Sequence, residues 1–366
     1  MSHRTVESPD LPQGQKSLLP LTRIRASLLK FYDQHKRDLP WRTSTGRPPA
    51  YHVLVSELML QQTQVVTVIA YFNRFIAAFA TLTDLARADE QQVLRLWQGL
   101  GYYSRARNLH RCAKAIVLDH AGVIPSDVAT LLTLPGIGPY TAGAIASIAF
   151  DKPAAIVDGN VMRVISRLDA LTADPRQKPA SLRIWARAGE LVPQDRAGDF
   201  NSALMELGAT ICTPKSPKCL VCPVQQECKA LAKGIVDRIP PPKVPKDKRV
   251  EKRDVLCISQ TAHGVTRWLV EQRPSKGRWA GMWQFVTRDA ADRPHIDSLH
   301  ITHLGQITHE LTHRSYEFDV WRVMCEGAET SLPTSAISCT RWASASDLDA
   351  LPMPRPHVRI RELIGI

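Results

Sequence analysis

Apolar residues recur at a spacing of three and four through the first part of the chain, from about Leu21 to Cys228. The stretches VTVIAYFNRFIAAF (residues 66–79) and DEQQVLRLWQGL (residues 89–100) show this spacing clearly. It is the period of an α-helix with one buried face, so we predict helices almost throughout this part of the chain. Turns rich in glycine and proline separate them, at RTSTGRPPA, HAGVIPS, LPGIGP and LTADPRQKP.

The pattern changes after Cys228. Residues 229–253 hold nine basic and three acidic side chains with four prolines, which predicts a semi-rigid basic linker. Beyond it, DVLCISQT, TRWLVEQR, MWQFVT, YEFDVWRVM and TRWAS are short, β-branched and aromatic, as strands are. We therefore expect a polar, disordered tail over 1–20, a mostly α-helical domain over 21–228, the linker over 229–253 and a small α+β domain over 254–366.

Charge and cysteine content narrow the class of protein. Lys and Arg outnumber Asp and Glu by 47 to 35, a net charge of +12. Such an excess favours a polyanionic partner, either nucleic acid or an acidic membrane surface. No apolar run approaches the roughly 18 residues of a membrane span, and the N-terminal segment has no apolar signal core. We expect a cytoplasmic protein whose eight cysteines stay reduced unless they bind metal.

Four of the cysteines are crowded into seventeen residues: Cys212, Cys219, Cys222 and Cys228. Their spacing is C-x6-C-x2-C-x5-C, and four thiolates in one loop suit either tetrahedral zinc or an iron–sulfur cluster. Structural zinc sites more often use two separated C-x2-C pairs, and this loop has one. The sequence predicts a metal centre, with zinc as the minor alternative. Lys215 and Lys218 inside the loop are candidates to meet phosphate.

The stretch LPGIGPYTAGAI (residues 134–145) is typical of a helix–hairpin–helix. Gly136 and Gly138 permit backbone conformations closed to other residues, and Pro139 suits the first turn of the second helix. The N–H groups at the start of that helix favour an anion, so the turn is a candidate phosphate site. A plain turn between two helices would use the same glycines.

Two carboxylates are candidates for acid–base chemistry. Glu57 lies in YHVLVSELMLQQTQV with apolar neighbours on both sides, where desolvation would raise its pKa as a general acid requires. Asp158 follows the apolar run PAAIV and precedes a predicted helix. The simpler interpretations are a solvated helix face for Glu57 and a helix cap for Asp158. The surroundings of either residue, taken alone, do not identify it as catalytic.

The motifs are more specific together. VSELMLQQTQV, LWQGLGYYSRARNL, LPGIGPYTAGAI, IVDGNVMRVISRL and the cysteine loop, in that order, resemble the helix–hairpin–helix DNA glycosylases of the endonuclease III superfamily. Within it, the chain is similar to the MutY-type adenine DNA glycosylases from about Leu21 to its C-terminus. The resemblance implies two helical lobes, a [4Fe–4S] cluster on the cysteines, and excision of a base flipped out of double-stranded DNA.

The resemblance also implies roles for the residues of the active site. Glu57 protonates adenine at N7, Asp158 stabilises the charge that develops on the deoxyribose, and Tyr140 and Asn160 orient the site. Bifunctional relatives carry a lysine at the position of Tyr140, and a phenol cannot form their Schiff base. The resemblance thus implies a monofunctional glycosylase that leaves an abasic site, with little or no AP lyase activity.

Further positions match family residues that contact DNA. Gln62, Thr63, Leu100 and Tyr102 match residues that wedge into the DNA double helix. Trp41 and Arg42 match residues near the adenine pocket. The hairpin glycines Gly136 and Gly138 are the remaining positions. The expected partner is DNA with adenine opposite 8-oxoguanine or guanine, bound by a monomer associated with a bacterial nucleoid. A mismatch thymine glycosylase and a non-enzymatic DNA-binding iron–sulfur protein are the alternatives.

The C-terminal part resembles the family's MutT-like, or Nudix-like, domain. KGRWAGMWQFV is similar to its glycine–tryptophan signature, and we find no acidic hydrolase box of the R-E-x-x-E-E kind. We therefore expect this domain to bind rather than hydrolyse. The family reads 8-oxoguanine with a Phe-Ser-His loop, and the corresponding residues here are Leu311, Thr312 and His313, with Leu in place of the aromatic residue.

Overall fold

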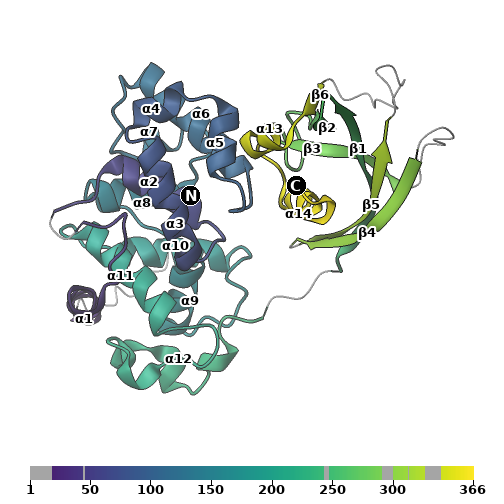
Figure 1. The fold of residues 1–366 in the computed structure, drawn as a ribbon. Helices are drawn as coiled ribbons and strands as arrows, with labels where there is room; N and C mark the ends of the chain where they lie inside the picture. The colour runs from purple at the N-terminus through teal and green to yellow at the C-terminus, as the bar shows by residue number, and fades with distance from the viewer. Residues whose placement is uncertain (1–18, 44–45, 243–246, 291–299, 312, 326–338) are drawn as a thin grey trace, which may run out of the picture. The chain divides into compact units, whose positions relative to one another are not determined.

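The computed structural model describes residues 19–43, 46–242, 247–290, 300–311, 313–325 and 339–366 (Figure 1). The chain divides into two compact units. The first unit consists of the described residues up to Arg37 and of Asp151–Pro242, and the second of Asp38–Phe150 with the described residues after Pro242. Within the described residues, no helix has the length and apolar character needed to cross a membrane.

The first unit is helical. Its helices are α1 (Leu19–His35), α9 (Gly159–Leu168), α10 (Ala180–Leu191), α11 (Ala197–Thr210) and α12 (Lys229–Ala232), with the 3-10 turns η2 (Cys219–Val221), η3 (Gln225–Glu227) and η4 (Val236–Arg238). α11 contacts both α1 and α9. The N-terminal helix is held in place by Arg25, which donates to the carbonyls of Glu190 and Leu191 at 2.8 and 2.9 Å, and by Arg37, which pairs with the buried Glu206 at 2.5 Å.

The second unit contains the central helix α2. The helices of this unit before Phe150 are α2 (Ala50–Leu60), α3 (Val65–Ala78), α4 (Leu82–Arg87), α5 (Glu90–Leu96), α6 (Ser104–Asp119), α7 (Val128–Leu131) and α8 (Pro139–Ala144), followed by the π-helical turn η1 (Ile145–Ala149). α2 contacts α3, α6, α8 and η1. All residues from Val53 to Met59 are buried, because a helix that is apolar on all sides packs on all sides.

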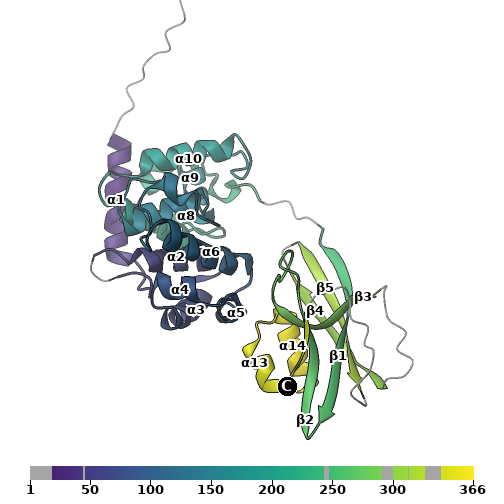
Figure 2. The ribbon, with the colours of Figure 1, turned by 90° about the horizontal axis from the view of Figure 1, so that it is seen from above.

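The second unit also holds a mixed six-stranded sheet. Its strands are β1 (Arg249–Ala262), β2 (Val265–Gln272), β3 (Trp283–Asp289), β4 (His300–Glu310), β5 (Arg314–Met324) and β6 (Thr340–Ala343), in the order β4-β5-β1-β3-β2-β6. β1 and β5 are parallel, and the other pairs are antiparallel. The helices α13 (Ala345–Ala350) and α14 (Arg355–Ile364) cover one face (Figure 2).

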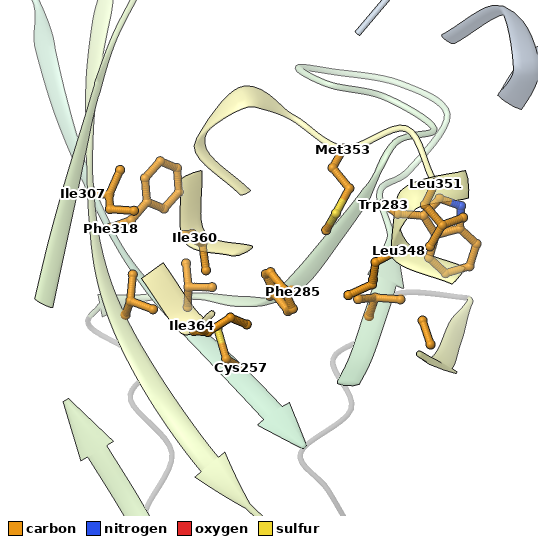
Figure 3. Close-up of a cluster of buried hydrophobic side chains, with 14 of the residues drawn as sticks. Cys257, Trp283, Phe285, Ile307, Phe318, Leu348, Leu351, Met353, Ile360 and Ile364 are labelled. Atoms are coloured by element: carbon orange, nitrogen blue, oxygen red, sulfur yellow. The ribbon is translucent and has the colours of Figure 1, made fainter. Parts of the chain in front are cut away.

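The sheet buries side chains on both faces. On the face with the helices, Ile360 and Ile364 of α14 pack with Cys257 and Phe318 (Figure 3). On the other face, Leu256, Ile258, Leu269, Val286, Val323 and Cys325 form a second cluster. Neighbours along β1 alternate between the two faces, as the period of two in a strand requires.

The structure corrects the predicted strands at two places. β4, HITHLGQITHE, was not predicted, because it lies at the edge of the sheet and has few apolar positions. β1 begins at Arg249, inside the stretch predicted as linker, because its first residues pair in parallel with β5 from Arg314 onward. Pairing with a distant strand overrides the local basic and proline-rich composition.

Candidate active site and metal centre

Glu57 and Tyr140 lie side by side. Glu57 is on α2 with 4% of its surface exposed, and Tyr140 is the second residue of α8. The Tyr140 hydroxyl donates to Glu57 Oε2 at 2.5 Å. A second bond, from Gln61 Nε2 to Thr141 Oγ1 at 3.3 Å, also joins the end of α2 to α8. The structure thus places the predicted acid inside the protein, on α2, where its carboxylate meets the hydroxyl of Tyr140 from the second helix of the glycine hairpin.

The hairpin between α7 and α8 requires glycine at position 136 for two reasons. Gly136 has φ +77°, the left-handed region that side chains disfavour. A Cβ there would also lie 2.4 Å from the Cβ of Asn108 on α6. Gly138, which precedes α8, is extended and faces open space. Its role as a phosphate contact stays a prediction.

Asp158 is the N-cap of α9. Its Oδ1 accepts from the backbone N–H groups of Asn160 and Val161 at 2.9 and 2.7 Å, and its Oδ2 accepts from Asn160 Nδ2 at 2.9 Å. Burial raises the pKa of the Asp158 carboxyl, and the three hydrogen bonds oppose that rise. Asp158 is therefore a helix cap, as the simpler interpretation predicted. The same hydrogen bonds also hold its carboxylate in one orientation.

Sequence reasoning missed Arg163, which supports Asn160 and, through it, the Asp158 carboxylate. It is buried on α9 and donates to Asn160 Oδ1 at 2.9 Å, to the carbonyl of Gly208 at 2.7 Å and to the carbonyl of Cys212 at 2.7 Å. The only local signal is a pair of arginines, Arg163 and Arg167, four residues apart in an otherwise apolar helix face. Both would ordinarily be assigned to solvent.

The four predicted metal ligands line one pocket, next to Arg167. Four cysteine thiols around one pocket are a donor set of the kind that holds an iron–sulfur cluster. Burial raises the pKa of the Cys222 thiol to about 12, and bound metal is what deprotonates such a thiol.

Arg167 complements this donor set. It is almost fully buried and its Nη1 donates to Cys212 Sγ at 3.3 Å and to the carbonyl of Thr213 at 2.8 Å. A guanidinium there offsets the negative charge of bound thiolates. The loop that carries the cysteines exposes Lys215 and Lys218 to solvent.

The other predicted contacts fall into two groups. Gln62 and Tyr102 are exposed and have the left-handed φ values +57° and +48°. Leu100 and Trp41 are buried, Trp41 against Phe72, while Thr63 and Arg42 are half-buried. None of these arrangements tests a contact with DNA.

The predicted lesion-reading residues lie between two strands. Leu311 and His313 connect β4 to β5, Leu311 packs against the core of the sheet, and His313 is exposed. Thr312 lies outside the described residues. An apolar residue at 311 is consistent with this packing, whatever the loop binds.

Three families match successive parts of the chain. Residues 55–188 match the HhH-GPD superfamily base excision DNA repair proteins, residues 212–228 the iron–sulfur binding domain of endonuclease III, and residues 256–363 the NUDIX domain. The solved structure of a thermostable thymine-DNA glycosylase is similar, with a TM-score of 0.53 and 29% identity over 59% of this chain and 98% of that one. The fold and the site define a helix–hairpin–helix DNA glycosylase with a [4Fe–4S] centre and a Nudix domain, which confirms the predicted fold class and cofactor.

Curated relatives are more specific. The human adenine DNA glycosylase is 37% identical over 91% of this chain and 72% of its own length. Those of Rattus norvegicus and Mycolicibacterium smegmatis are 39% and 47% identical, over 86% and 54% of this chain and 73% and 66% of their own lengths. The chain belongs to the adenine DNA glycosylase family, whose members act in base excision repair. The predicted resemblance is confirmed.

Packing between α9 and α11 gives a prediction about Gly208. A Cβ at this position would lie 2.6 Å from the Cβ of Asn160. The side chain of Asn160 donates a hydrogen bond to the Asp158 carboxylate. We expect Gly208→Ala to lower the rate of adenine release by on the order of 10- to 100-fold, because the start of α9 must move, and to cost about 1–3 kcal/mol of stability.

The matched control is Gly189→Ala in α10, where an added Cβ meets nothing within 4 Å. It should leave release unchanged and stabilise the helix by about 0.5–1 kcal/mol. Single-turnover assays and thermal unfolding measure the two effects. Equal activity of the two alanine variants would contradict the role of Gly208.

Proposed function

We propose that this enzyme removes adenine mispaired with 8-oxoguanine or guanine by hydrolysing the N-glycosidic bond, and that it leaves the strand intact. The observation that carries the proposal is the hydrogen bond from Tyr140 to the buried Glu57. It pairs a buried carboxyl, suited to proton transfer, with a phenol at the position where a strand-cleaving relative would have an amine.

In this proposal Glu57 is the general acid. Its carboxyl donates a proton to N7 of the flipped adenine, and the neutralised base leaves with the electrons of the C1′–N9 bond. Because Tyr140 donates to Oε2, the other carboxyl oxygen is the one that carries the proton to the base. Positioned proton transfer of this kind contributes about 10²- to 10⁴-fold to a rate.

Asp158 and Asn160 act on the sugar. A carboxylate beside the anomeric carbon stabilises the positive charge that builds up as the base leaves, as in hydrolases that act on glycosidic bonds with two carboxyl groups. The helix cap keeps the Asp158 oxygens fixed, so little reorganisation is needed when that charge develops. Water then adds to C1′, which leaves an abasic site.

Tyr140 is the reason to propose a monofunctional enzyme. A lyase reaction needs an amine that attacks C1′ and forms a Schiff base. The phenol oxygen of Tyr140 instead serves Glu57 as a hydrogen-bond donor. Tyr140 is thus a positioning residue in this proposal.

The remaining predicted residues bind DNA in the same proposal. The hairpin with Gly136 and Gly138 and the lysines 215 and 218 contact phosphates. A [4Fe–4S] cluster on the four cysteines supplies no step of the hydrolysis and orders the loop that carries these lysines.

Readout of the mispair is assigned to the other predicted positions. Gln62 and Tyr102, supported by Thr63 and Leu100, enter the duplex, while Trp41 and Arg42 border the adenine pocket. The segment Leu311–His313 of the Nudix domain reads 8-oxoguanine. The protein acts as a monomer, and the linker between its helical part and its Nudix domain ends before β1, which begins at Arg249.

A panel of duplexes tests the proposal. The holoenzyme should release adenine from A:8-oxoguanine and A:G duplexes, and strand cleavage should appear only after alkali. Cleavage without alkali would contradict the monofunctional assignment. Release of thymine from T:G in place of adenine would favour the second candidate, a mismatch thymine glycosylase. The similarity to the structure of a thymine-DNA glycosylase supports this candidate.

A further inference from the structure

Arg105, near the start of α6, is a buried guanidinium that holds the end of α2. Only 6% of its surface is exposed. Its Nη1 donates to the carbonyl oxygens of Leu58 and Met59, both at 2.8 Å, and of Gln61 at 2.6 Å. These carbonyls belong to the last turn of α2 and to the residue after it, where helix carbonyls have no intrahelical partner.

The other terminal nitrogen of Arg105 holds a second loop. Nη2 donates to the carbonyl oxygens of Leu100 and Gly101 at 3.3 and 3.0 Å, and to Thr63 Oγ1 at 3.2 Å. The guanidinium also lies over the ring of Tyr102, 5.4 Å from its centroid. One side chain therefore connects the loop after α2 with the loop before α6.

Each loop presents one exposed side chain in a left-handed backbone conformation, Gln62 at φ +57° and Tyr102 at φ +48°. Such conformations cost free energy for residues with side chains and persist only where the surroundings impose them. Arg105 binds both neighbours of Gln62. It binds Gly101 on one side of Tyr102, and its own backbone N–H donates to the Tyr102 carbonyl at 2.8 Å.

The chemistry of the side chain suits this task. Burial lowers the pKa of Arg105 to about 10, so the group stays charged at neutral pH. Its planar fork of N–H donors reaches acceptors in two directions at once. A lysine ammonium has three donors at a single point and cannot serve the six oxygens that surround Arg105.

We propose that Arg105 is a positioning residue that fixes Gln62 and Tyr102 relative to each other, so that both enter the duplex as one rigid pair of wedges. The inference rests on the proposed function, in which these two side chains enter DNA. Arg105 touches neither the DNA nor the reacting atoms, and it acts through the backbone of the two loops.

The first experiment examines the holoenzyme without DNA. Hydrogen exchange of peptides covering residues 58–65 and 97–105 is compared between the parent, Arg105→Lys and the control Arg87→Lys, an exposed arginine of α4. We expect exchange in both peptides to become at least about tenfold faster in Arg105→Lys and to stay as in the parent in Arg87→Lys. Thr63→Val, which deletes one of the six acceptors, gives the same change in smaller size and serves if Arg105→Lys does not fold.

The second experiment measures opening of the duplex, with 2-aminopurine in place of the target adenine as a fluorescent probe. Gln62→Ala and Tyr102→Ala, each introduced alone into the parent protein, should lower the fraction of duplex that is opened. Arg105→Lys should lower it as much as the double alanine variant, and should lower single-turnover adenine release by on the order of 10- to 100-fold. In the Arg105→Lys background, the two alanine changes should add little, because coupled residues are not additive.

The outcomes separate the two proposals. Unchanged exchange in Arg105→Lys, or opening as in the parent, overturns the positioning role while the wedge assignment stands. Parent-like opening in both alanine variants overturns the wedge assignment and with it the inference. Faster exchange together with non-additive loss of opening supports both.

Discussion

Replacing Glu57 by glutamine is expected to lower adenine release from an A:8-oxoguanine duplex by on the order of 10³-fold, the typical contribution of a positioned general acid. Glutamine keeps the size of the side chain, and its amide oxygen can still accept the hydrogen bond from Tyr140. It has no acidic proton to give to adenine N7. Single-turnover kinetics, with alkali to reveal abasic sites, measures the loss.

Two further variants make the Glu57 result specific. Glu362→Gln changes an exposed glutamate of α14 and should leave release unchanged. Tyr140→Phe removes the donor to Glu57 but not the acid, so its loss should be smaller. Affinity for the duplex should stay near that of the parent in Glu57→Gln, because phosphate contacts carry most binding. Release within about threefold of the parent by Glu57→Gln would exclude Glu57 as the general acid.

Asp158→Asn should also abolish most of the activity, by about 10²- to 10³-fold, because a neutral amide cannot balance the charge on the sugar. Asparagine is as good an N-cap as aspartate, so α9 keeps its start. The new amide N–H₂ would, however, face the donating side chain of Asn160 where Oδ2 now accepts. We expect a stability loss of about 1–2 kcal/mol from this contact, which thermal unfolding separates from the loss of catalysis.

The pH dependence provides an independent check on Asp158. Burial raises the pKa of this carboxyl in the folded protein, so it takes up a proton at a higher pH than an exposed aspartate. Release by the parent should therefore fall as the pH drops through that raised pKa, and this acid limb should be missing from the residual activity of Asp158→Asn. An acid limb that is the same in both proteins would mean that another group titrates.

The same shift has an opposite consequence for stability. Since the folded pKa of Asp158 lies above the unfolded value, protonation favours the folded state. The stabilising contribution is complete below the unfolded pKa and is lost as the pH rises through the folded pKa. Asp158→Asn removes this contribution, so its stability should change less than that of the parent over that range.

Local patterns were sufficient for much of the architecture. The three- to four-residue apolar period predicted the helices before Cys228, and the shorter period predicted strands at β1, β2, β3, β5 and β6. β4 was missed because an edge strand has one neighbour and needs few apolar residues. The cysteine spacing predicted a metal centre, because the four ligands lie in one loop and need no distant contact to come together.

The amino-acid sequence by itself determined which residue types are present, how they are spaced and which family the motifs resemble. Only the tertiary structure decided that Tyr140 donates to Glu57, 83 residues away, and that Arg105 connects loops 40 residues apart in sequence. It also buried Arg163 and Arg167, which sequence rules assign to solvent. The physical reason is that hydrogen bonds between distant segments depend on how whole helices pack, and local periodicity contains no information on which partner a polar side chain will meet.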